Sequence, residues 1–124
     1  MTPAKVADAS VVAARAFGEP RADEAERLLE SADLFAPQLL AYELTNVARK
    51  KALQFPNDVS AIEQGFRWAL MLDIQWVDVD HQAVLALALE KGITAYDASY
   101  LYVARSLGAP LVTFDAALRA ASSS

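Results

Sequence analysis

Short apolar segments that alternate with pairs of helical segments constrain the fold of this chain more than any other feature. The segments of strand type are residues 5–7, 34–36, 76–79 and 111–114. The helical segments are residues 11–17, 22–32, 38–53, 59–72, 83–91, 96–107 and 115–121. Alternation of this kind is typical of a parallel sheet with helices on both faces. The sequence therefore predicts an α/β fold, a three-layer α/β/α sandwich around a central parallel sheet of four strands.

The segment of residues 94–115 is the clearest unit of this pattern, and it contains two acids. Its helix ends at Gly108, a common signal for a helix stop, and its strand leads directly into Asp115. Asp97 lies in the first turn of the helix, and Leu101 follows it one turn later on the same face. An acid that points along an apolar face needs a partner, a proton or a metal.

Two further acids occupy comparable positions. Asp8 follows the first strand as Asp115 follows the last, and ligands of parallel sheets bind beyond the carboxyl ends of the strands, where the strand order switches. If these two strands are neighbours, both acids converge there. Glu43 lies in an apolar helix stripe between Leu40 and Val47. For each acid alone, a helix cap, a dipole-complementing acid or a surface ion pair is the alternative explanation.

Composition limits the classes of function. The 124 residues are 55% hydrophobic, which suits a single domain, expected at residues 1–121 with a disordered tail at residues 122–124. The apolar segments are too short to span a membrane and the N-terminus resembles no signal peptide, so we expect a cytoplasmic protein. The absence of Cys excludes thiolate metal sites. The net charge of −5 argues against nucleic-acid binding unless basic groups or bound cations reverse the field locally.

The four acids also occur in a characteristic order. Asp8, Glu43, Asp97 and Asp115 are set in the sequences DAS, YELTN, AYDASYL and VTFD. This ordered set strongly resembles the PIN-domain nucleases and, among them, the VapC-type toxins of bacterial toxin–antitoxin pairs. The resemblance covers nearly the whole chain and implies a PIN-like fold. PIN domains commonly carry a further C-terminal edge strand, so the sheet would have four strands, or five if a partner completes the edge.

The resemblance implies a role for each residue. Asp8, Asp97 and Asp115 would hold a divalent metal, Mg²⁺ or Mn²⁺, and Glu43 would complete the catalytic pocket. Polar side chains at positions that support the pocket are Ser10, Asn46 and Thr113. Clustered carboxylates suit such a hard cation, which orients a water, lowers its pKa and stabilises charge on a phosphoryl group.

The implied activity is metal-dependent endonucleolytic hydrolysis of RNA by the toxin of a toxin–antitoxin pair. The implied partners are the RNA substrate, a cognate antitoxin and a second copy in a homodimer, with no role for a membrane. Candidate contacts to the RNA backbone are Arg15, Arg49, Lys50, Lys51 and Arg105, although any one of them could be an ordinary solvated helix residue.

Other interpretations remain open on the residues alone. A receiver-like phosphotransfer domain could use Asp78 or Asp80 as its phosphate acceptor, but it needs a Lys after a later strand and none follows Asp115. A haloacid-dehalogenase-type phosphatase needs Asp-x-Asp after the first strand, where this chain has Asp8 and Ser10. A catalytically silent interaction module could share the same fold.

Overall fold

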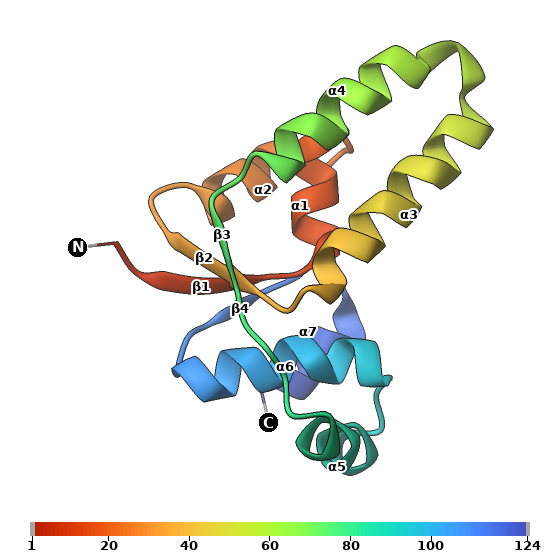
Figure 1. Ribbon diagram of the computed structural model, residues 1–124. Coiled ribbons are helices and arrows are strands. Elements are labelled where there is room, and N and C mark those ends of the chain that lie inside the picture. The colour runs from red at the N-terminus through yellow and green to blue at the C-terminus, as the bar shows by residue number, and fades with distance from the viewer. Residues whose placement is uncertain (1, 124) are drawn as a thin grey trace.

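The computed structural model describes residues 2–123 and shows a sheet between two layers of helices (Figure 1). The strands are β1 (Ala4–Ala7), β2 (Asp33–Ala36), β3 (Ile74–Trp76) and β4 (Leu111–Val112). They form one sheet in the order β3-β2-β1-β4, in which every neighbouring pair is parallel. The predicted α/β sandwich with a parallel sheet of four strands is therefore confirmed.

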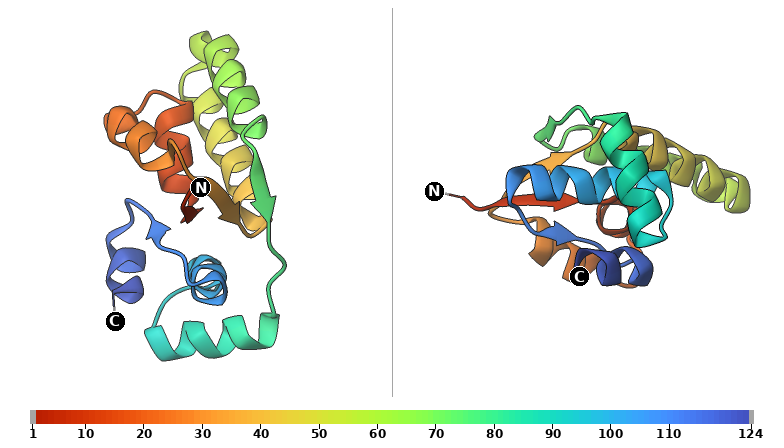
Figure 2. Two further views of the ribbon diagram at one scale, coloured as in Figure 1. Left: turned by 90° about the vertical axis from the view of Figure 1, so that its left-hand side faces the viewer. Right: turned by 90° about the horizontal axis from the view of Figure 1, so that it is seen from below.

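Seven α-helices cover the two faces of the sheet. They are α1 (Ala9–Ala16), α2 (Ala22–Leu29), α3 (Leu39–Gln54), α4 (Val59–Leu70), α5 (His81–Lys91), α6 (Ala95–Leu107) and α7 (Ala116–Ser122). Helices α1 to α4 lie on one face and α5 to α7 on the other (Figures 1 and 2). A single 3-10 turn, Pro56–Asp58, joins α3 to α4. Within residues 2–123, no helix combines the length and the apolar character that crossing a membrane requires.

The segment where β1 passes into α1 is almost entirely buried. Val6 and Ala7 at the end of β1 are buried, because α6 packs on this part of the sheet and β1 has a neighbour on each side. The four residues Val11–Ala14 of α1 are all buried as well, since α2, α3 and α4 pack around this helix. The chain between β1 and α1, where Asp8 lies, is thus anchored on both sides by apolar packing.

The third strand ends earlier than predicted. We expected it at residues 76–79, but β3 ends at Trp76 and residues 77–80 form an extended connection to α5. The neighbouring strand explains the difference: β2 ends at Ala36, whose carbonyl accepts the last bond, from Val77 N, and Pro37 begins the turn into α3. The alternating pattern after Trp76 reflects inward packing of Val77 and Val79 without a partner strand.

The boundaries at the C-terminal end also differ. We expected a strand at residues 111–114, but β4 contains only Leu111 and Val112, because the next residues turn toward the end of β1 and bond to side chains there. Helix α7 ends at Ser122, one residue beyond the expected domain end, and so Ser122 is not part of a disordered tail. Residue 124 lies outside the described residues.

Helices α1 and α4 approach each other unusually closely. A Cβ atom added at Gly65 of α4 would lie 2.2 Å from the backbone carbonyl oxygen of Ala16, a distance that real Cβ atoms do not reach. Gly65 therefore permits a contact between helix backbones that any larger residue would prevent. This contact holds the α3–α4 hairpin, which projects from the sheet in Figure 1, against the layer that carries Asp8.

Candidate active site

The candidate site lies where the strand order of the sheet switches. The chain proceeds from β1 to β2 on one side of β1, whereas β4 pairs on the other side, with Val6 opposite Leu111 and Ala7 opposite Val112. The carboxyl ends of β1 and β4 are therefore adjacent, which is the condition under which the sequence predicts that Asp8 and Asp115 converge. Parallel sheets bind ligands at such a crevice.

Asp8 is the buried centre of this site, with 6% of its surface exposed. Its Oδ1 accepts hydrogen bonds from Ser10 Oγ at 2.6 Å and from the backbone N–H of Val11 at 3.3 Å, as the N-cap of α1. Its Oδ2 accepts a bond from Thr113 Oγ1 at 2.5 Å. Burial raises the pKa of the Asp8 carboxyl, and these hydrogen bonds oppose the rise.

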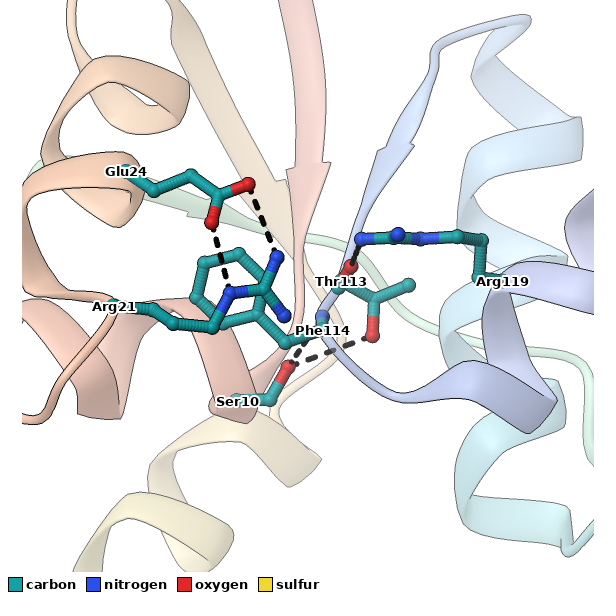
Figure 3. A network of polar contacts seen from close by, with 6 residues as sticks. All are labelled: Ser10, Arg21, Glu24, Thr113, Phe114 and Arg119. Atoms are coloured by element: carbon teal, nitrogen blue, oxygen red, sulfur yellow. Dashed lines mark hydrogen bonds and ion pairs between the residues drawn. The ribbon is translucent and has the colours of Figure 1, made fainter.

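Ser10 and Thr113 join the ends of the two central strands. The backbone N–H of Phe114 donates to Ser10 Oγ at 2.9 Å (Figure 3). The backbone N–H of Asp115 donates to Thr113 Oγ1 at 3.0 Å. Each hydroxyl thus accepts from the backbone after β4 while it donates to Asp8. The structure places both predicted supporting residues directly against Asp8, and through them it determines where Asp115 lies.

Asp115 and Asp97 each lie in or next to the first turn of a helix. Asp115 is the N-cap of α7, and its Oδ1 accepts a bond from Leu118 N at 2.8 Å. Asp97 is in the first turn of α6, where its backbone N–H donates to the capping Thr94 Oγ1 at 3.1 Å. Within residues 2–123, no hydrogen bond reaches the Asp97 carboxylate. Burial, followed by repulsion from Asp115 and Asp8, raises the pKa of Asp97.

Glu43 is held by a residue that the sequence analysis did not single out. The hydroxyl of Tyr100, on α6, donates to Glu43 Oε1, on α3, at 2.5 Å. Tyr100 is only 2% exposed, so its hydroxyl sits at the end of a ring packed in the core. Its position three residues after Asp97, on the same face of the helix, was the available signal, because a buried Tyr usually finds a polar partner.

The Tyr100–Glu43 contact affects the protonation of both groups. Burial raises the pKa of Glu43, the bond from Tyr100 opposes the rise, and repulsion from Asp8 and Asp97 adds to it. Burial and the bond to Glu43 raise the pKa of Tyr100 far above its ordinary value, so the phenol stays protonated and acts as a donor. Repulsion thus acts among all four acids, which converge from β1, α3, α6 and the start of α7.

The chemistry of the four side chains suits a hard divalent cation. All four offer carboxylate oxygens as ligands. Burial raises the pKa of three of these carboxyls, and repulsion from neighbouring acids raises the pKa of two of the three further. Within residues 2–123, no three Asp, Glu or His side chains already stand at the distances of metal ligands. The residues therefore have the ligand chemistry that such an ion requires. The Asp97 carboxylate accepts no hydrogen bond from the described residues, so it is the acid least constrained from moving toward a bound cation.

Several predicted site residues form no hydrogen bond or ion pair with the four acids within residues 2–123. Asn46 is exposed on α3 and makes no hydrogen bond to the acids in the described part of the chain. Lys51 pairs with Glu19 at 2.8 Å, and Arg15 lies over the ring of Trp68, 4.6 Å from its centroid. The remaining basic candidates lie at helix surfaces beyond the acidic turns: Arg49 and Lys50 in the second half of α3, and Arg105 in the last turn of α6.

Comparisons with known proteins agree with this architecture. Residues 5–123 match the family model of the PIN domain. The chain is 33% identical over 115 residues to Ribonuclease VapC3 of Pyrobaculum aerophilum, an alignment that covers 89% of this chain and 88% of that protein. It is 39% identical over 82 residues to Exonuclease VapC9 of the same organism, which covers 66% and 62% of the two chains. The crystal structure of PAE2754 from Pyrobaculum aerophilum superimposes with a TM-score of 0.76 and 32% identity, over 96% of this chain and 79% of that one.

Proposed function

This chain belongs to the PIN-domain family, and from that premise we propose that it is a metal-dependent endoribonuclease that acts as the toxin of a toxin–antitoxin pair. The observation that carries the proposal is the convergence of Asp8, Glu43, Asp97 and Asp115 at the switch in strand order. The names of the relatives, a ribonuclease and an exonuclease of VapC type, support hydrolysis of nucleic-acid phosphodiesters. A receiver-like phosphotransfer domain has no comparable support.

In the proposed site, Asp8, Asp97 and Asp115 would hold one or more Mg²⁺ or Mn²⁺ ions. Such an ion supplies Lewis-acid stabilisation of the phosphoryl oxygens and a lower pKa for a bound water. Ser10 and Thr113 keep the Asp8 carboxylate in one orientation, because each donates to one of its oxygens. Tyr100 holds Oε1 of Glu43, which leaves Oε2 to accept a hydrogen bond from the attacking water.

The first prediction concerns the acids themselves. Asp8→Asn, Asp97→Asn and Asp115→Asn should each reduce cleavage of RNA by a factor of about a hundred or more, because Asn keeps the volume but loses the negative charge that a cation needs. Cleavage of total RNA is followed on gels with Mg²⁺, with Mn²⁺ and with chelator, and circular dichroism verifies that each variant is folded.

The matched control for this series is Asp58→Asn, an exposed acid at the turn between α3 and α4, which should cleave like the wild type. Undiminished cleavage by all three active-site variants would contradict the metal assignment. No cleavage by the wild type with either metal would instead favour a silent interaction module on the PIN fold.

The proposal extends to partners and location. We infer a cytoplasmic protein that binds a cognate antitoxin, whose Arg or Lys side chain could enter the acidic pocket in place of the cation. We also infer a homodimer, and exposed apolar side chains offer contact area for either interface; Tyr42, Met71 and Leu89 are each at least 75% exposed. Co-purification from the native operon and light scattering of the isolated chain measure the two associations.

A further inference from the structure

An acidic pocket in a chain of net charge −5 needs local positive charge if it is to attract RNA. Within residues 2–123, none of the five basic residues named from the sequence forms a hydrogen bond, an ion pair or a ring contact with the turn that leads into Asp115. The structure instead places two other arginines, Arg21 and Arg119, beside the turn that leads into Asp115 (Figure 3).

Arg21 is held against this turn by an aromatic ring. Its guanidinium lies over Phe114, 3.7 Å from the ring centroid, and Glu24 accepts from Nε at 2.8 Å and from Nη2 at 3.0 Å. Among the described residues, Nη1 makes no hydrogen bond. The Arg21 side chain remains 46% exposed, so a planar cation is held in a defined orientation and is still accessible to an anion.

Arg119 approaches the same turn from the opposite side. It lies one helical turn after Asp115 on α7, and its Nη2 donates to the backbone carbonyl of Thr113 at 2.7 Å. Within residues 2–123, Arg119 has no acidic ion-pair partner. The pKa of the Glu24 carboxyl on α2 is lowered first by its bond from Arg21 and also by the positive charge of Arg119. Figure 3 shows both guanidinium groups directed toward the segment of Thr113 and Phe114.

This segment is the same one that builds the acidic pocket. Thr113 donates to Asp8, Phe114 donates to Ser10, and Asp115 follows directly. Two arginines that are 98 positions apart in the sequence thus flank the edge of the acid cluster. A polymer with regularly spaced phosphates suits this arrangement. One phosphate would lie at the acids and their cation, and neighbouring phosphates would bind the two guanidinium groups.

We propose that Arg21 and Arg119 form a phosphate-binding pair that seats single-stranded RNA next to the cleavage site. This inference rests on the proposed ribonuclease function and deepens it. Phe114 serves to orient Arg21, because the guanidinium already covers the ring face on which a base would otherwise stack. The pair reads backbone charge, so it contributes affinity and register and makes no choice among bases.

The test measures the salt dependence of RNA binding. A short fluorescein-labelled single-stranded RNA of mixed sequence is titrated with the chain in chelator, which prevents cleavage, over a series of salt concentrations. Each lost phosphate contact should reduce the slope of log affinity against log salt by about 0.7, and should weaken binding about fivefold near 0.1 M salt. Arg21→Gln and Arg119→Gln should each show this change, and the double variant about twice the change in slope.

Two further variants separate binding from a structural role. Arg119→Lys keeps the charge and should restore the salt slope, even if losing the planar contact to Thr113 lowers the melting temperature. Arg67→Gln removes an exposed arginine on α4 that pairs with Glu63 and has no contact with the turn that leads into Asp115 among the described residues, and it should leave the slope unchanged. In cleavage assays with metal, the Arg21 and Arg119 variants should raise KM while kcat changes little.

The outcomes distinguish this inference from the function on which it rests. A slope that is unchanged in both Gln variants, while the wild type cleaves RNA, overturns the phosphate-binding pair and leaves the nuclease proposal intact. An unchanged slope together with loss of antitoxin co-purification assigns the arginines to the protein interface and overturns the RNA role. A wild type that neither binds nor cleaves the RNA overturns both proposals.

Discussion

Asp8, Glu43 and Asp97 are held in three different ways, although all three are acids with a raised pKa. Asp8 is buried and surrounded by donors, Glu43 is held by one phenol, and Asp97 accepts no hydrogen bond from the described residues. Burial, followed by repulsion from Asp115 and Asp8, raises the pKa of the Asp97 carboxyl, and no hydrogen-bond donor among the described residues opposes this rise.

Tyr100 provides the sharpest test at a single residue. Tyr100→Phe keeps the buried ring but removes the bond to Glu43 Oε1, so we expect a loss of about 1 kcal/mol in the free energy of unfolding. Because Glu43 can then rotate, kcat should fall while KM changes little. Urea unfolding and steady-state cleavage measure the two effects.

The control for this residue is Tyr102→Phe on the same helix, a half-buried tyrosine for which no bond of the hydroxyl to the acids exists within residues 2–123. If the Tyr100 variant has the same kcat as the Tyr102 variant, Tyr100 does not position Glu43 for the reaction.

Among the elements, the strands end where their neighbours end. The chain leaves the sheet after β3 because the neighbouring strand β2 has already turned at Pro37. It leaves the sheet after β4 because the next backbone N–H groups donate to the hydroxyls of Ser10 and Thr113. The close approach of helices α1 and α4 likewise depends on a neighbouring element, because only a residue without a side chain, Gly65, fits against the backbone of α1.

Gly65→Ala tests this packing. Ala is favoured over Gly in a helix by about 1 kcal/mol, but its Cβ would stand 2.2 Å from the carbonyl oxygen of Ala16, so α4 must shift. Overpacking of this kind costs about 1–3 kcal/mol, and together with the loss of close packing we expect net destabilisation. Thermal or urea unfolding gives the sign.

Ser60→Ala, at an exposed position of the same helix, makes the matched comparison and should be neutral or slightly stabilising. A Gly65→Ala protein as stable as the Ser60→Ala protein would show that α1 and α4 are not in backbone contact.

Four acids of the molecule gather at the carboxyl ends of its strands, and this makes the free energy of unfolding depend on pH and on bound metal. Because the folded pKa of Asp8, Glu43 and Asp97 lies above the ordinary value, the folded state binds more protons than the unfolded state. Without metal, this contribution is fully present below the unfolded pKa. It is lost as the pH rises from about 4 through the raised values.

Metal should reverse this dependence, because it binds the ionised, folded site. At neutral pH, Mn²⁺ at about a hundred times its Kd should add about 2.7 kcal/mol to the free energy of unfolding.

Thermal melts of the wild type and Asp97→Asn, with chelator and with Mn²⁺, measure the effect. In chelator the variant should be as stable as the wild type or more stable, since repulsion is relieved, and it should lose most of the metal-induced shift. An equal metal shift in both proteins would mean that Asp97 does not belong to the metal site.

The order of strands and helices, the parallel sheet and the positions of the four acids were all predictable from the sequence. These features depend on local signals: apolar periodicity, a glycine at the end of α6, and acids directly after apolar strands. Boundaries were less predictable, since β3 and β4 end for reasons that lie in β2 and in Ser10.

The partners of the acids were decided only by tertiary structure. The bond from Tyr100 to Glu43 spans 57 positions and that from Thr113 to Asp8 spans 105, so neither leaves a pattern in the neighbouring sequence. The same holds for Arg21 and Arg119, which contact neighbouring residues, Phe114 and Thr113, only because β4 pairs beside β1. The sequence by itself determined which side chains could bind a cation, because residue type and local geometry are written along the chain. Which donors hold those side chains, and which positive charges stand beside them, depended on the packing of distant segments, because a hydrogen bond or a stacked ring forms only between groups that the fold has brought together.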